Sequence, residues 1–144
     1  MKFIAVVIFS LIMATTAGAA TATLESKDAA KKLTDQVMDK VVAGDVEAGL
    51  LLLKPYLIIP ESEFNVMLEQ TKLQLPAIQG RFGKVLGSEF IREKSVGKSL
   101  LQVVQIQKFE KHIMRWNFVF YCPDGKWILN TFNFDDKIQL MFEE

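Results

Sequence analysis

The sequence has few of the residues from which disulfides and metal sites are built. Its 144 residues include one cysteine, Cys122, and one histidine, His112. A lone cysteine cannot form a disulfide within the chain, so the fold must be stabilised by its core. A zinc site needs three or four ligands, so no metal is expected. Nor does any motif indicate a reaction, so we expect no catalytic residue and no cofactor.

The sequence also lacks an excess of positive or negative charge, and it has no long hydrophobic run beyond the N-terminus. Lys and Arg balance Asp and Glu at 17 each, and this balance argues against a nucleic-acid partner, which needs a basic face. No segment after the first 22 residues is apolar enough to span a membrane, so no membrane span is expected once those residues are removed. What remains is the composition of a soluble domain.

Residues 1–19 have the pattern of a secretory signal peptide. Lys2 is followed by an apolar run over residues 3–13 and then by small residues, and the run is too short for a membrane anchor. Cleavage after Ala19 is expected, with Ala22 as the latest site. The protein is therefore predicted to be secreted or periplasmic, with residues 23–144 as a single domain of about 120 residues.

The first half of this domain has the periodicity of helices. Apolar residues recur at steps of three and four over residues 26–42, which predicts an amphipathic helix. A second, short helix is predicted over residues 45–53. A third helical pattern opens near Ser62, and Pro76 and Gly80 are expected to end it.

The second half has the composition of strands. β-branched and aromatic residues recur in four segments separated by turn residues, over residues 84–94, 99–109, 112–121 and 126–134. Helices followed by such a meander predict an α+β fold. We expect the N-terminal helices to pack on one face of a curved four-stranded antiparallel sheet, in a roll.

Residues 123–125, Pro-Asp-Gly, predict a tight hairpin with Cys122 opposite Lys126. That register places large aromatic side chains and Asn130 on the face toward the helices. Extended to the preceding strand, it adds Gln105 and Gln107, whose facing stays open because a bulge between the strands would reverse it. These side chains are packed core, or they line a cavity for a small apolar ligand. The ligand-binding candidates are Asn130, Gln105, Trp116, Phe118, Phe120 and Phe132.

The opposite face of the predicted hairpin is apolar near its turn and polar further away. Its apolar residues are Tyr121, Trp127, Val119 and Leu129. Such a surface suits a partner protein or a second copy of the chain. These four residues are therefore the predicted interface of a homodimer.

Four blocks resemble the nuclear-transport-factor-like superfamily, whose fold is a cystatin-like α+β roll. They are AGDVEAGLLLLKPYL (43–57), FGKVLGSEF (82–90), VQIQKFEK (104–111) and FYCPDGKWILNTFNF (120–134). The resemblance is closest to small secreted members of unknown function. It implies a cone-shaped roll around an apolar pocket, often with dimers through the outer sheet face. Enzymes of the superfamily carry Asp, Tyr or His in that pocket, whereas the inward positions predicted here are amides and aromatics.

The function predicted first is a secreted or periplasmic, non-catalytic binding or accessory domain that holds a small apolar molecule or a protein partner. One alternative is an isomerase-type or hydrolase-type enzyme on an apolar substrate, for which Glu89 and Glu93 are the nearest carboxylates. Cys122 and His112 lie at opposite ends of one predicted strand, so they do not form a nucleophile and base pair. The other alternative is a purely structural, dimeric interaction module.

Overall fold

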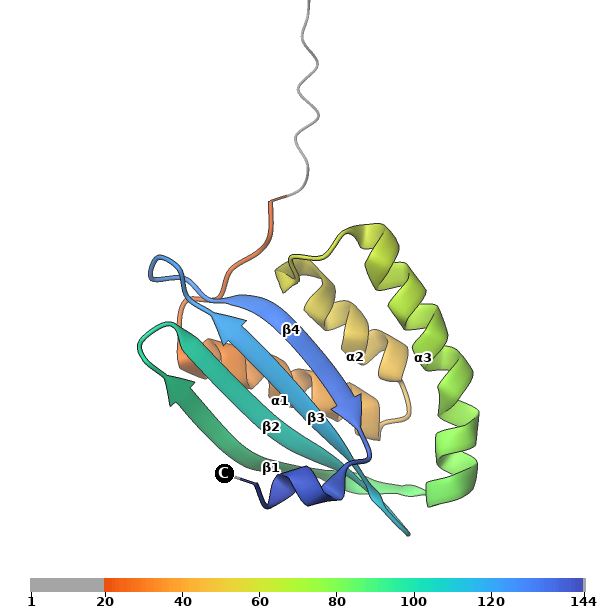
Figure 1. Ribbon diagram of the computed structural model, residues 1–144. Coiled ribbons are helices and arrows are strands. Elements are labelled where there is room, and N and C mark those ends of the chain that lie inside the picture. The colour runs from red at the N-terminus through yellow and green to blue at the C-terminus, as the bar shows by residue number, and fades with distance from the viewer. Residues whose placement is uncertain (1–19, 144) are drawn as a thin grey trace, which may run out of the picture.

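The structure, a computed structural model, describes residues 20–143 (Figure 1). Three helices are followed by four antiparallel strands that form one sheet in the order β1-β2-β3-β4. Figure 1 shows α1 and α2 behind the sheet and the long α3 beside α2. The predicted α+β class and the four-stranded meander are confirmed. The predicted signal peptide, residues 1–19, lies outside the described residues.

The first two helices begin where the sequence predicts them. In α1, Lys27–Val42, the Ser26 side chain accepts a hydrogen bond of 3.0 Å from the backbone N–H of Ala29. In α2, Val46–Leu53, the Asp45 side chain accepts a hydrogen bond of 2.9 Å from the backbone N–H of Ala48. Each cap satisfies a backbone donor that the first turn of a helix leaves open. A short 3-10 turn, η1 (Lys54–Tyr56), follows α2.

Helix α3, Glu61–Phe82, is longer than predicted. Pro76 lies inside it, and the helix ends at Gly83, whose φ of 87° suits glycine. The prediction that Pro76 and Gly80 end the helix was wrong. A proline inside a helix costs about 3 kcal/mol, but Phe82 is buried against the ring of Phe109 at 5.6 Å. This packing favours a helix that continues past Pro76 to Phe82, its last residue.

The strands are β1 (Val85–Val96), β2 (Leu100–Phe109), β3 (Ile113–Tyr121) and β4 (Ile128–Asp135). Between β2 and β3 the register is regular, with Leu101 opposite Phe120 and Gln105 opposite Trp116. Gln105 and Gln107, whose facing the sequence left open, both point inward and are buried.

The register between β3 and β4 differs from the predicted one. Phe118 lies opposite Phe132, not opposite Asn130. Trp127 does not pair within the hairpin, because its backbone forms a bridge with Leu24 through hydrogen bonds of 2.8 and 2.9 Å. The loop is therefore longer than three residues. A bulge at Asn130 then shifts the register once more.

One apolar core joins the helices to the inward face of the sheet. Its fully buried side chains come from all three α-helices and every strand except β1, and include Val37, Val41, Leu50, Leu53, Phe64, Leu101, Val103, Phe118, Phe120 and Leu129. The C-terminal 3-10 helix η2, Ile138–Met141, lies on the outer face, the side of the sheet away from the helices (Figure 1). Arg92 on β1 donates to the Met141 carbonyl at 3.4 Å.

Candidate functional site

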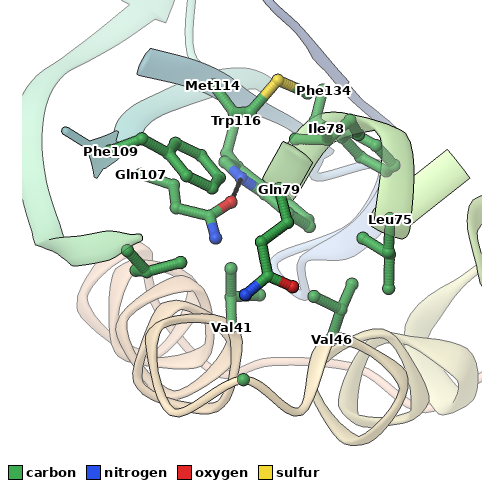
Figure 2. A pocket seen from close by; sticks show the side chains of 12 residues that line it. Val41, Val46, Leu75, Ile78, Gln79, Gln107, Phe109, Met114, Trp116 and Phe134 are labelled. Atoms are coloured by element: carbon green, nitrogen blue, oxygen red, sulfur yellow. Dashed lines mark hydrogen bonds between the residues drawn. The ribbon is translucent and has the colours of Figure 1, made fainter. Parts of the chain in front are cut away.

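A pocket of about 120 Å³ lies at the end of the sheet where β1 and β3 begin (Figure 2). The turn between α1 and α2 forms its floor, and the C-terminal half of α3 forms one wall. Its apolar lining is Val41, Val46, Leu75, Ile78, Val85, Phe109, Met114, Trp116 and Phe134. Gly44, Gln79 and Gln107 complete the lining. The walls are thus apolar, with two amides.

The pocket exists because α3 packs on the rest of the protein mainly at its ends. Its buried residues are Phe64, Leu68 and Thr71 in the first half and Phe82 at the last position. Between them, Leu75 and Ile78 are only half-buried. The helix therefore stands off the sheet along this stretch, and the gap is the pocket.

Gln107 is the buried polar group of the pocket. Its side chain is 6% exposed. Its Oε1 accepts a hydrogen bond of 3.3 Å from the indole Nε1–H of Trp116, drawn as the dashed line in Figure 2. The second amide, Gln79, is an exposed residue of α3. None of the lining side chains is ionisable, so acid–base chemistry has no group in the lining to perform it.

The volume limits what the pocket can hold. A dry cavity of about 150 Å³ holds benzene, or about 25 Å³ per carbon atom. By that measure 120 Å³ is room for about five non-hydrogen atoms, and because the pocket opens to solvent a sixth atom can lie at its mouth. A single ring or a short chain fits. A fused ring system does not fit without movement of a wall.

The predicted ligand-binding residues fall into different places. Trp116 lines the pocket, while Phe118 and Phe120 are fully buried in the core beyond it. Phe132 is half-buried against the same core. Gln105 is buried and donates through Nε2 to the Thr34 hydroxyl at 2.8 Å and to an Asp35 oxygen at 2.9 Å. Gln105 therefore joins the sheet to α1. Ligand binding by the predicted set of residues stays a prediction.

The predicted orientation of Asn130 was wrong. Its side chain is exposed, because the bulge takes it out of the alternation that points Leu129 and Phe132 inward. The wall of the pocket that α3 forms was not predicted from the sequence. Its signal was present as Leu75, Ile78 and Phe82 at steps of three and four, but the expected break at Pro76 concealed it.

Two of the four predicted interface residues face inward. Trp127 and Leu129 are buried, because Trp127 pairs with Leu24 and Leu129 with Leu57. The prediction that they form an outer surface was wrong. Val119 is half-buried and Tyr121 is exposed on the outer face. Dimerisation through these residues stays a prediction.

The remaining chemical candidates lie apart from the pocket. Glu89 and Glu93 are exposed on β1, and Glu89 lies 3.7 Å from Lys108. His112 stacks on the Phe82 ring at 4.7 Å, and Cys122 is half-buried beyond the opposite end of β3. Among residues 20–143 no three His, Cys, Asp or Glu side chains gather closely enough to hold a metal ion.

One ion pair is shielded on the outer face. Arg115 donates to both oxygens of Asp135, at 3.1 and 2.7 Å. These hydrogen bonds hold the pKa of Asp135 below its ordinary value, against the opposing effect of burial. Asn117 and Asn133 extend the polar row from Asp135 to Gln102. The row explains why the outer face is polar away from the turn.

Comparison with known proteins finds no match: no family model, no curated protein and no solved structure matches the chain. In the described part of the chain, no helix has both the length and the apolar character needed to cross a membrane.

Proposed function

We propose that this protein is a non-catalytic binding domain that holds a small apolar molecule in the pocket between α3 and the sheet. The observation that carries the proposal is the lining itself. Nine apolar side chains surround one buried amide, Gln107. Apolar walls with a few placed polar groups are the usual composition of a small-molecule site.

The affinity follows from the size of the pocket. Burial of an apolar group contributes about 0.8 kcal/mol for each methylene-sized unit. A ligand of six carbons therefore gains about 5 kcal/mol, which corresponds to a Kd of a few tenths of a millimolar. A natural ligand that also bonds to an amide would bind more tightly.

Titration with benzene tests the proposal, because the two tryptophans are placed differently. Trp116 lines the pocket, whereas Trp127 is paired with Leu24 and is not part of the lining. In ¹⁵N–¹H NMR spectra, the indole signal of Trp116 should shift and saturate with the expected Kd, and that of Trp127 should stay in place. Equal, non-saturating shifts of both signals would rule out a specific site.

Export to a secretory or periplasmic compartment belongs to the same proposal, and the N-terminal sequence supports it. Of two contacts near the new N-terminus, one favours cleavage after Ala19. The Ala22 N–H donates to the Pro55 carbonyl at 2.8 Å, and Leu24 pairs with Trp127. Cleavage after Ala22 would remove the first contact, while cleavage after Ala19 keeps both. The mass of the mature protein distinguishes the two sites.

Membership of the nuclear-transport-factor-like superfamily is also proposed. The four sequence blocks support it, and so does the arrangement of three helices on one face of a four-stranded antiparallel meander. A solved structure of a relative with recognisable sequence identity would test this proposal by superposition. Different connectivity in that relative would contradict it.

A protein partner on the outer face is the second candidate function. Val96, Leu100, Tyr121 and Ile128 are direct cross-strand neighbours in one row. The first three are 60%, 41% and 38% exposed. An exposed apolar row across four strands is a feature of interaction surfaces. Sedimentation of the wild type and of Tyr121→Ser tests it, and a monomer mass for both would exclude self-association.

A further inference from the structure

The orientation of the Gln107 amide is fixed by its neighbour. The indole of Trp116 has a single N–H donor and no acceptor. Only the oxygen of Gln107 can therefore face it, at 3.3 Å. A reversed amide would bring two donors together. The –NH₂ group must then point away from Trp116.

The nitrogen of Gln107 lies on the pocket side. Figure 2 shows it directed toward Val41 and Gln79, away from the dashed bond to Trp116. Among residues 20–143 the side chain of Gln107 forms no hydrogen bond other than the one to Trp116. No fully covered side-chain donor or acceptor lacks a partner in this part of the chain, so the nitrogen must reach the open space of the pocket.

Gln105, two residues earlier on the same strand, provides the contrast. Its nitrogen already has two acceptors, Thr34 and Asp35. The sequence Gln105-Ile106-Gln107 thus carries one saturated amide that ties the sheet to α1. It also carries one amide with two unused N–H donors. Water can satisfy these donors while the pocket is empty, but an occupant that displaces the water leaves them unpaired unless it brings an acceptor of its own. Gln107 therefore favours an occupant that accepts a hydrogen bond.

The lining also limits the charge of the occupant. None of the residues that line the pocket is charged. A cation would meet donors and apolar groups, and a carboxylate would lose its hydration without a positive partner, which is costly. A neutral oxygen acceptor is the ligand group that the lining suits.

Resting on the proposed function, we propose that the natural ligand is a small neutral carbonyl compound. Its oxygen accepts a hydrogen bond from Nε2 of Gln107. Its apolar body, of about the size of benzene, lies between Trp116 and the wall formed by Leu75 and Ile78. Ketones, esters, lactones and amides of this size share the required chemistry.

A matched ligand pair tests the proposal. Cyclopentanone and methylenecyclopentane have the same number of non-hydrogen atoms and differ in C=O against C=CH₂. Their dissociation constants are measured by NMR titration for the wild type, Gln107→Met and the control Gln102→Met. Gln102 is on the same strand but on the outer face, bonded to Asn117. One hydrogen bond gained in exchange for water corresponds to about a fivefold to tenfold change in affinity.

The ratio of the two affinities gives the answer. We expect Gln107→Met to lower the preference for the ketone fivefold to tenfold relative to the wild type, and Gln102→Met to leave it unchanged. If both ligands bind and the ratio is the same in all three proteins, the acceptor inference is wrong while the pocket stands. If neither ligand binds the wild type, the proposed function itself fails and the inference falls with it.

A second measurement needs no variant and covers the case in which Gln107→Met does not fold. In the wild type, the side-chain amide protons of Gln107 should shift downfield with cyclopentanone and much less with methylenecyclopentane. Equal shifts with both ligands would overturn the inference.

Discussion

Val46 is the side chain whose enlargement should close the pocket. It opens α2 and projects into the space below α3 (Figure 2). Val46→Phe adds four carbon atoms, which at about 25 Å³ each take up most of the 120 Å³ of the pocket. The phenyl ring should therefore occupy the space that a ligand would use.

The stability of this variant should change little. Burial of four more carbons gains up to about 3 kcal/mol, and fitting an extra group into a core costs about 1 to 3 kcal/mol. The free energy of unfolding, measured with urea, should stay within about 2 kcal/mol of the wild type. The affinity for benzene, measured by NMR titration, should fall at least tenfold.

Val66→Phe is the matched control. Val66 lies on α3 with 58% of its surface exposed and is not part of the pocket lining. The same chemical change there should leave benzene binding intact. If Val46→Phe folds and still binds benzene as the wild type does, benzene binds elsewhere and the assignment of the pocket is refuted.

Three further substitutions test interactions elsewhere in the fold. Asp135→Asn should lower the free energy of unfolding by about 1 kcal/mol at neutral pH. Because Arg115 lowers the folded-state pKa of Asp135, this difference should persist above the ordinary Asp pKa of about 3.9 and shrink in urea titrations at lower pH; a constant difference would contradict it. Gly83→Ala should cost more stability than Gly44→Ala. Both glycines have φ of 87°, but a Cβ at Gly83 would collide with the Glu110 carboxylate while one at Gly44 meets nothing within 4 Å, so equal melting temperatures would be the opposing result. Gln105→Met should lose about 1 to 2 kcal/mol in urea denaturation through its bonds to α1, and an unchanged midpoint would show that those bonds add nothing.

Local signals in the sequence were enough to predict most of the fold. Ser26 and Asp45 cap α1 and α2 through contacts with residues three positions later. The starts of both helices can therefore be predicted from short segments of the sequence. Alternation on β2 puts Gln105 and Gln107 in one row, although the side that this row faces stayed open because it depends on the turn between β2 and β3. Such features depend on few residues that are close in sequence.

The predictions were wrong where the local structure depends on contacts between residues that are far apart in sequence. The loop before β4 is long because Trp127 pairs with Leu24, about a hundred positions away in sequence. That pairing, with the bulge at Asn130, reverses the expected facing of three side chains. Helix α3 passes Pro76 because Phe82 packs against Phe109 and His112. No short segment contains either contact.

The candidate site was predictable only in part. The alternation on β3 places Trp116 on the inward face, and both this indole and Gln107 do line the pocket. The empty space itself depends on how far α3 stands from the sheet. That distance is set by Phe64, Leu68 and Phe82 at the two ends of the helix, and spacing in the sequence does not report it.

The most direct test is a crystal structure of the protein soaked with benzene. The proposed function predicts density for one ring against Trp116, between the α3 wall and the turn at Gly44. A pocket that holds only ordered water, with benzene absent or bound on the surface, would contradict it.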